Sequence, residues 1–171
     1  LMFEGMPEEP GWRATIGAGG EPGRPLVVRG VIYKSDDKTP APGVILYVYQ
    51  ADAAGHYAPG PGQVHGRRHG RLRGWMKTGA DGRYEFRTIR PAPYPGRAIP
   101  AHIHPVVKEP DRNEYYIDEF LFDDDPLLTE AERAGREGRG GPGVLEVTED
   151  DEGVLTGSRD IILGRNIPDY E

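Results

Sequence analysis

The chain has 171 residues and a formal net charge of −7, which fits a single domain with its own hydrophobic core. This acidic balance argues against a nucleic-acid partner, because nucleic acids are bound by basic faces. The sequence contains no cysteine, so disulfides, thiolate nucleophiles and cysteine-ligated zinc or iron–sulfur sites are excluded. No apolar run approaches the roughly 20 residues that span a bilayer, so we expect no membrane partner.

The cellular compartment is left open, because the absence of cysteine gives no signal in either direction. The chain begins at Leu1 rather than Met, and we expect that an upstream segment has been removed. The localisation is therefore unknown, cytoplasmic or exported, with a slight preference for export.

The first segment of the chain differs in composition from the rest. Residues 1–25 are rich in Gly, Pro and Glu, and we expect an irregular N-terminal arm that lies on the domain outside its core. Runs rich in Val, Ile and Tyr follow, separated by Gly, Pro and Asp turns, and they are candidate strands. They cover residues 26–33, 43–51, 82–89, 103–108, 114–122, 143–148 and 157–164. The sequence therefore predicts that residues 26–171 form an all-β domain, a β-sandwich of about seven to eight strands.

A capping signal near the end of the chain predicts one short helix. Thr129 is followed three residues later by Glu132, good helix formers come next, and Gly135 or Gly138 can end the helix. We expect this helix near residues 129–138. The stretch "FDDDP" before it resembles a divalent-cation site, but three adjacent aspartates point in different directions, so we interpret it as a strand-end turn.

Two histidines alternate with an apolar residue in "AHIHP", residues 101–105. If this stretch is extended, His102 and His104 project from one face while Ile103 points into the core. Such a pair is compatible with two hydrogen-bonded structural histidines and with two metal ligands. The motif alone does not decide between them.

Two tyrosines are candidate partners of this pair. Tyr94 lies between Pro93 and Pro95, so its backbone is stiff and extended, and Tyr57 lies in a Gly-flanked loop after an apolar strand. A single tyrosine is most often a packing residue. Two phenols combined with two imidazoles, however, suit Fe(III) better than zinc or a soft metal. A trivalent ion can also ionise a phenol whose pKa is ordinarily about 10.

Five segments, in order, resemble the intradiol ring-cleavage dioxygenases, the non-haem ferric enzymes that open catechols. They are "GVIYKSDDKTPAPGVILYVYQADAAGHY", "RGWMKTGADGRYEFRTIRPAPYP", "PAHIHP", "FLFDDDPLL" and "RDIILGR". The resemblance extends over roughly residues 28–163. It implies that Tyr57 and Tyr94 are tyrosinate ligands of Fe(III) and that His102 and His104 are its imidazole ligands. Tyr94 and His102 would be axial, and Tyr57, His104 and a hydroxide equatorial.

The resemblance also implies a reaction. A catechol displaces the hydroxide and Tyr94, which take up its protons, and O2 then opens the ring between the hydroxyls to give a muconate-type diacid. Tyr94 is therefore also a candidate catalytic residue. The implied partners are a small catechol-type substrate and O2, and a homo-oligomer is left open.

Two positions depart from the family pattern. The family carries arginine three residues before the first histidine, where this chain has Ile99, and Arg97 is a candidate catalytic substitute only if no bulge intervenes. Protocatechuate-type enzymes have a glutamine where this chain has Glu119. We expect Glu119 to be neutral, paired with an arginine or turned away from the metal.

A basic segment follows Tyr57 in the sequence "VHGRRHGRLRG". It fits either a solvated loop or a pocket rim whose guanidinium binds a substrate carboxylate. We expect its two histidines at the surface. The residues concerned are His65, Arg67, Arg68, His69, Arg71 and Arg73.

Other classes of protein share parts of this pattern. A transthyretin-like or adhesin-type β-sandwich binding module uses the same Gly, Pro and Asp turns without catalysis. A zinc or copper hydrolase or oxidase uses an H-x-H pair, but needs a further ligand. A metal-binding relative of the intradiol enzymes with a different substrate is the third alternative. The discriminating feature is whether the tyrosine and histidine pairs lie together.

Overall fold

The computed structural model describes residues 2–17, 19–65 and 67–171, without the side chain of Arg67. The described residues form short strands, one 3-10 helix, η1 (Arg67–His69), and one α-helix, α1 (Glu130–Ala134). The strands are β1 (Arg13–Thr15), β2 (Pro25–Tyr33), β3 (Ile45–Gln50), β4 (Arg73–Lys77), β5 (Arg83–Ile89), β6 (Ile103–Lys108), β7 (Tyr115–Tyr116), β8 (Leu121–Phe122), β9 (Val144–Leu145), β10 (Thr148–Glu149), β11 (Leu155–Ser158) and β12 (Ile161–Ile162). The all-β prediction is confirmed.

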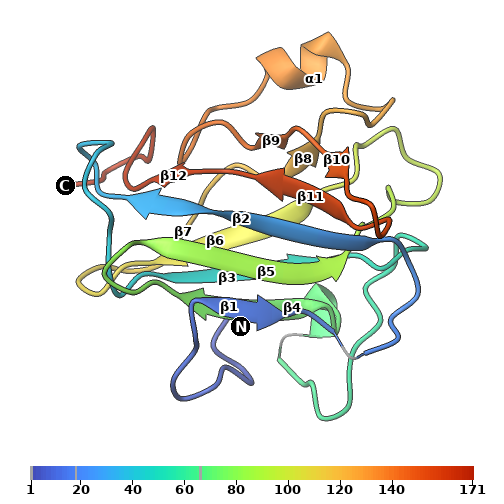
Figure 1. The fold of residues 1–171 in the computed structure, drawn as a ribbon, viewed down its shortest axis with the longest axis horizontal. Helices are drawn as coiled ribbons and strands as arrows, with labels where there is room; N and C mark the ends of the chain where they lie inside the picture. Colours follow the sequence, from blue (N-terminus) through green and yellow to red (C-terminus); the bar gives the residue numbers. More distant parts are fainter. Residues whose placement is uncertain (1, 18, 66) are drawn as a thin grey trace.

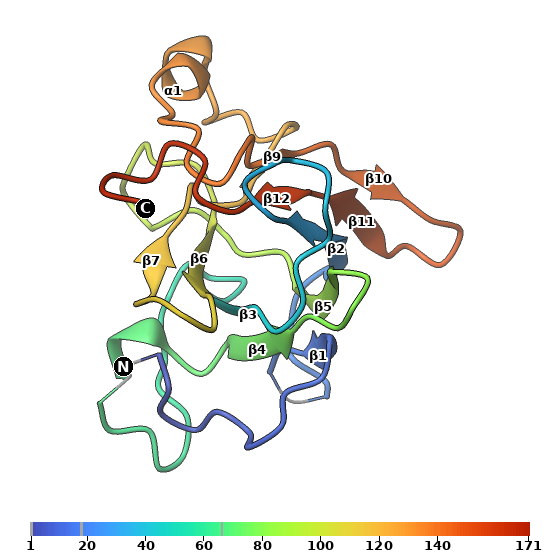
Figure 2. The same ribbon diagram turned by 90° about the vertical axis from the view of Figure 1, so that its left-hand side faces the viewer.

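Two main sheets face each other (Figures 1 and 2). The first has the order β1-β5-β2-β11-β10, with β12 also paired to β2, and the second has the order β4-β3-β6-β7. A third, two-stranded sheet joins β8 and β9. His104 lies on β6, an interior strand of the second sheet, and His102 directly precedes this strand. β3 holds the register of β6: Tyr49 pairs with His104 and Gln50 with Ile103.

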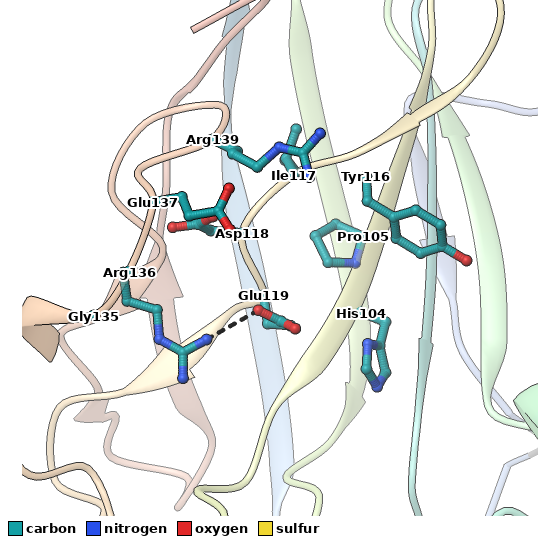
Figure 3. Close-up of a pocket in the computed structure, with 10 residues that line it drawn as sticks. All are labelled: His104, Pro105, Tyr116, Ile117, Asp118, Glu119, Gly135, Arg136, Glu137 and Arg139. Carbon is teal, nitrogen blue, oxygen red and sulfur yellow. Dashed lines mark hydrogen bonds and ion pairs between the residues drawn. The ribbon is translucent and has the colours of Figure 1, made fainter. Parts of the chain in front are cut away.

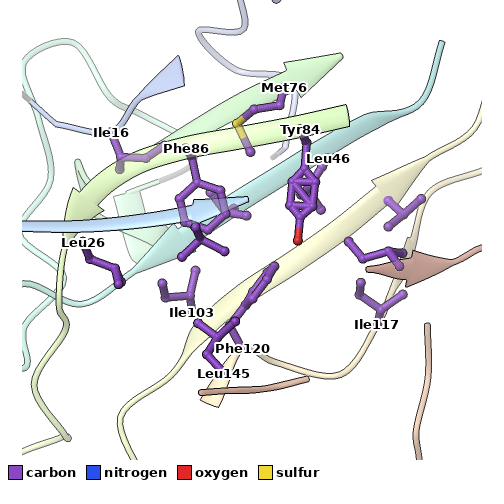
Figure 4. Close-up of a cluster of buried hydrophobic side chains, with 14 of the residues drawn as sticks. Ile16, Leu26, Leu46, Met76, Tyr84, Phe86, Ile103, Ile117, Phe120 and Leu145 are labelled. Carbon is purple, nitrogen blue, oxygen red and sulfur yellow. The ribbon is translucent and has the colours of Figure 1, made fainter. Parts of the chain in front are cut away.

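The core lies between the two main sheets (Figure 4). Leu26 on β2 and Phe86 on β5 meet Leu46 on β3 and Ile103 on β6, all fully buried. Because side chains alternate along a strand, burying Ile103 sends His102 and His104 away from this core. The packing of the sandwich therefore determines the face from which the histidines project.

The strand count exceeds the predicted seven to eight for a physical reason. Two of the last predicted runs change partner midway. The run 143–148 pairs with β8 through Val144 and Leu145, and at its end Thr148, together with Glu149, pairs with β11. Similarly, the run 114–122 leaves the edge of β6 at Asp118, whose backbone N–H donates to the carbonyl of Arg139. Each run therefore gives two short strands.

The expectation of an irregular arm outside the core is wrong at several residues. β1 pairs in parallel with β5, and the N–H of Ile16 donates to the carbonyl of Arg87 at 2.7 Å. Ile16 is buried in the main core, and Met2 is buried against Tyr47 in a smaller cluster. These residues cover an edge of β5 that would otherwise present unpaired backbone groups.

The predicted helix is confirmed as α1. The hydroxyl of Thr129 accepts a hydrogen bond from the backbone N–H of Glu132, and Gly135 forms the C-cap. The aspartates before it belong to a turn: Asp125 accepts from the N–H of Leu127, and Asp124 pairs with Arg90. No helix among the described residues has the length and apolarity needed to cross a bilayer.

Candidate metal centre

His102, directly before β6, and His104, on β6, turn their Nε2 atoms toward one point. The Nε2 atoms of His102 and His104 are 3.0 Å apart, and the two rings are nearly perpendicular, at 88°. The Nδ1 of His102 donates to the carbonyl of Pro100 at 2.8 Å, since a carbonyl can only accept. This hydrogen bond leaves Nε2 of His102 with a free lone pair, as a metal ligand requires.

The two predicted tyrosines reach the same point from two loops. The hydroxyls of Tyr57 and Tyr94 are 2.7 Å apart, and that of Tyr94 lies 3.0 Å from Nε2 of His102 and 3.4 Å from Nε2 of His104. The loops touch at Gly55, whose φ is +83° and where a Cβ would overlap the carbonyl of Pro93. A glycine at this position therefore lets the two tyrosine loops pack together.

We call Tyr57, Tyr94, His102 and His104 the quartet. Its donor atoms fit a shared cation, because atoms about 2.1 Å from one ion lie roughly 3 Å from each other. Among residues 2–17, 19–65 and 67–171 no three His, Asp or Glu side chains are grouped to hold a metal ion. The further donors beside the histidine pair are thus phenol oxygens, which suit a hard trivalent ion such as Fe(III).

Burial keeps His104 and Tyr57 uncharged in the absence of a cation. Burial, with smaller contributions from His102 and His69, lowers the pKa of His104 to about 3. Burial also raises the pKa of Tyr57 well above its ordinary value, and the hydrogen bond with Tyr94 adds to this. Ionising Tyr57 therefore requires a nearby positive charge, which a trivalent ion supplies.

A stack of rings supports His104 from behind. Tyr49 on β3 stacks on His104 with ring centres 4.6 Å apart, and His69 stacks on the other face of Tyr49 at 3.8 Å. Nδ1 of His69 lies 2.7 Å from the hydroxyl of Tyr47, which accepts from Arg73 and can donate its own proton to His69. Burial lowers the pKa of His69 to about 4, so this ring is neutral at pH 7.

The prediction that His69 lies at the surface is wrong, whereas His65 is exposed as predicted. His69 is 5% exposed because η1 folds back on β3, where the imidazole packs against the rings of Tyr47 and Tyr49. No local pattern signals this contact, since a histidine between arginine and glycine in a basic loop resembles a solvated residue. His69 therefore supports the site from a position that the sequence pattern hides.

A cavity of about 210 Å³ opens on the quartet. Tyr57, Tyr94 and His104 form one part of its lining; the rest comes from Tyr49, Arg68, His69 and Tyr116. A cavity on the order of 150 Å³ can hold benzene, so this one has room for a single aromatic ring. Arg68 belongs to the basic segment for which a pocket rim was one interpretation, whereas Tyr116 was not assigned to the site from the sequence.

Arg97 does not line this cavity, and its side chain is exposed. Its backbone N–H donates to the carbonyl of Tyr94 at 3.2 Å, which closes a turn rather than directing the guanidinium inward. Ile99 is 38% exposed on the same segment. The structure therefore brings Arg68, rather than Arg97, to the cavity beside the quartet.

Glu119 is paired with an arginine, one of the three arrangements expected for it. Its Oε2 lies 3.1 Å from Nη1 of Arg136, which also binds Glu132 at 2.8 Å. Glu119, Arg136 and His104 line a second cavity of about 380 Å³ (Figure 3). The carboxylate of Glu119 thus has an arginine partner, which it shares with Glu132.

The family model described as "Dioxygenase" matches residues 8–136. The chain belongs to the intradiol ring-cleavage dioxygenases. The chain is 35% identical over 109 residues to 6-chlorohydroxyquinol 1,2-dioxygenase of Cupriavidus pinatubonensis, covering 54% of this chain and 38% of that protein. It is 33% identical over 123 residues to catechol 1,2-dioxygenase 1 of Acinetobacter lwoffii, covering 61% of this chain and 38% of that protein. The match thus spans less than half of either relative.

Solved structures agree with the sandwich. The dioxygenase domain of a dioxygenase carbohydrate-binding protein fusion from Streptomyces sp. SirexAA-E has a TM-score of 0.67 and 28% identity, covering 92% of this chain and 91% of that one. Catechol 1,2-dioxygenase from Acinetobacter sp. ADP1 has a TM-score of 0.71 and 22% identity, covering 98% of this chain and 62% of that one. The second likeness bears on the fold alone.

Proposed function

We propose that this intradiol dioxygenase cleaves a catechol-type ring between its two hydroxyls with O2, giving a muconate-type diacid. The observation that carries the proposal is the convergence of the quartet, whose donor atoms contact one another at 2.7 to 3.4 Å. A β-sandwich with a purely structural or binding role gives no reason to hold two phenols and two imidazoles at one point. A zinc or copper enzyme leaves the two tyrosines unexplained.

The quartet would hold the metal, with Tyr57 and Tyr94 as tyrosinates and His102 and His104 as neutral imidazoles. Fe(III) bound there supplies a Lewis acid that favours the ionised diol and makes its ring reactive toward O2. The hydrogen bond from His102 to Pro100 and the stack of Tyr49 on His104 keep both imidazoles oriented. These contacts pre-organise the ligands before substrate arrives.

Tyr94 is the residue that can move a proton. Its hydroxyl contacts Tyr57 and both histidines, so its oxygen lies at the centre of the quartet. A tyrosinate there can accept one proton of the entering diol, and the hydrogen bond between Tyr57 and Tyr94 marks a partner for the phenol that results. The 210 Å³ cavity beside it has room for the ring.

The overall reaction balances without a further reductant. The carbon–carbon bond between the two hydroxyl-bearing carbons breaks, each of these carbons receives one atom of O2, and the electrons that reduce O2 come from the ring. The diacid therefore keeps every carbon, hydrogen and oxygen atom of the diol and gains both atoms of one O2 molecule.

The direct test is O2 consumption by the iron-loaded protein with catechol, hydroxyquinol and protocatechuate in turn. We expect at least one diol to be consumed in equal amount to O2, with a diacid whose mass is that of the diol plus O2. The variant Tyr94→Phe should lose most of this activity. Absence of uptake with all three diols, from protein of verified iron content, would contradict the proposal.

A further inference from the structure

Among the described residues that line the cavity at the quartet, one carries a permanently charged side chain, and the reaction described above does not use it. Arg68 lies on η1 and lines this cavity together with Tyr57, Tyr94 and His104. None of the described residues that line it is a lysine, an aspartate or a glutamate. A permanently charged group at such a site favours a ligand of opposite charge.

Arg68 is held in place by its neighbour, while its guanidinium is left available. His69, the next residue, is buried and anchored by Tyr47 and Tyr49, so the backbone of Arg68 cannot drift far from the cavity. The guanidinium of Arg68 has no ion pair or hydrogen bond with any residue that the structure describes. Its exposed side chain therefore binds a ligand without first breaking a contact within the protein.

The other described arginines of the basic segment are already engaged. Arg71 forms two hydrogen bonds with Glu21, at 2.6 and 3.1 Å, and Arg73 donates to Tyr47 and lies over Trp75. The interpretation of the segment as a solvated loop therefore fails at these positions. Its interpretation as a pocket rim applies to Arg68.

The neighbouring 380 Å³ cavity differs in its charge. Its lining contains arginines, but also Asp118, Glu119 and Glu137, and its Arg136 is paired with two glutamates. An anionic ligand there would meet carboxylates as well as guanidinium groups. Of the two cavities beside His104, the one with Arg68 is thus the better site for an anion.

We propose that Arg68 binds a carboxylate on the substrate, so that the preferred substrates are aromatic diols with a carboxylate on the ring. This inference rests on the proposed function, because it needs the diol oxygens at the quartet. The planar guanidinium then grips the carboxylate through two parallel hydrogen bonds, a geometry that lysine does not reproduce. Arg68 is a specificity residue and takes no part in proton transfer.

The test measures the affinity of the iron-loaded protein, without O2, for 3,4-dihydroxybenzoate and for catechol. Binding is monitored through the change in the visible tyrosinate-to-iron band. The variants are Arg68→Glu, Arg68→Lys and, as a control with the same change in net charge, Arg24→Glu on the surface of the other sheet. We expect Arg68→Glu to weaken the binding of 3,4-dihydroxybenzoate about tenfold or more and the binding of catechol less than about twofold. The affinity of Arg68→Lys for 3,4-dihydroxybenzoate should lie between those of the wild type and of Arg68→Glu.

The inference and the proposed function fail in different ways. If both diols bind and Arg68→Glu weakens the binding of both equally, or of neither, the inference is overturned while the proposed function stands. If Arg24→Glu reproduces the selective loss, the effect is one of net charge, and the inference is again overturned. If neither diol changes the band of wild-type protein, the proposed function fails, and the inference fails with it.

Discussion

The buried carboxylate of Asp125 accepts a hydrogen bond from the backbone N–H of Ala101 at 2.8 Å, directly before His102. The other oxygen of the same carboxylate accepts from the N–H of Leu127 at 2.9 Å. The turn after β8 is thereby tied to the start of β6. One aspartate fixes both the turn and the entry of the chain into the histidine pair.

Replacing Asp125 with Asn should loosen this entry. An amide can accept through one oxygen only, so its NH2 group faces either Ala101 or Leu127, and one buried N–H loses its acceptor. We expect the free energy of unfolding of the metal-free protein to fall by about 1–3 kcal/mol. Iron should bind about tenfold more weakly.

Chemical denaturation and a competitive chelator titration measure these two quantities. The matched control is Asp124→Asn, next to it, because Asp124 is half exposed and only pairs with Arg90. Equal iron affinities for the two variants would mean that Asp125 does not position His102.

His69 should support the site without binding the metal. Phe at this position keeps a flat ring against Tyr49 but removes the acceptor for the buried hydroxyl of Tyr47. We expect His69→Phe to lower the free energy of unfolding by about 1–3 kcal/mol and to keep the visible band of the iron-loaded protein. His65→Phe, on the exposed part of the same loop, should change neither. Loss of the band in His69→Phe alone would indicate that His69 is a ligand.

Gly30 on β2 lies so close to the backbone of Arg159, in the link between β11 and β12, that no side chain fits at position 30. A Cβ there would overlap the carbonyl oxygen of Arg159, which the hydroxyl of Tyr84 holds at 2.6 Å. We expect Gly30→Ala to lower the melting temperature strongly, corresponding to about 3 kcal/mol or more, because backbone atoms must move. Gly79→Ala, with nothing within 4 Å, is the control and should be nearly neutral. A wild-type melting temperature for Gly30→Ala would contradict this packing.

The turn at Asp36 should make stability depend on pH in the acid range. Hydrogen bonds from the Thr39 side chain, and then from the N–H groups of Thr39 and Lys38, lower the pKa of Asp36 from 3.8 to about 2. Because the folded pKa is the lower one, the stabilisation is present above about pH 4 and is lost as the pH falls through about 2. Urea unfolding of wild type and Asp36→Ala should therefore differ near pH 6 and converge toward pH 2. A difference that stays constant with pH would exclude this linkage.

Local sequence patterns predicted the strands in which consecutive residues all favour an extended conformation. The runs around β2, β3, β5 and β6 are rich in Val, Ile and Tyr, and they form where they were expected. β4 was missed because "RGWMK" has charged ends and a glycine, and it becomes a strand through pairing with β3. β1 was missed for a similar reason, since its strand character comes from the open edge of β5.

The candidate site likewise contains residues that local patterns marked and residues that long-range contacts place. Strand alternation and the flanking prolines and glycines marked Tyr57, Tyr94, His102 and His104 as candidates, and the resemblance to the intradiol enzymes implied that the four act together. Arg68 and His69 could not be placed, because η1 takes its position from contacts with Tyr47 and Tyr49, which are some 20 residues away in the sequence. Long-range contacts of this kind leave no periodic signal in a single sequence.

The measurement that tests the central claim most directly is the visible spectrum of iron-replete protein. If Tyr57 and Tyr94 bind Fe(III), the protein is burgundy through tyrosinate-to-iron charge transfer, and Tyr57→Phe and Tyr94→Phe each shift or weaken the band. Tyr33→Phe, on β2 in the other sheet, leaves it unchanged. A colourless protein that nevertheless holds one iron per chain, or a band that survives both substitutions unaltered, would contradict the account.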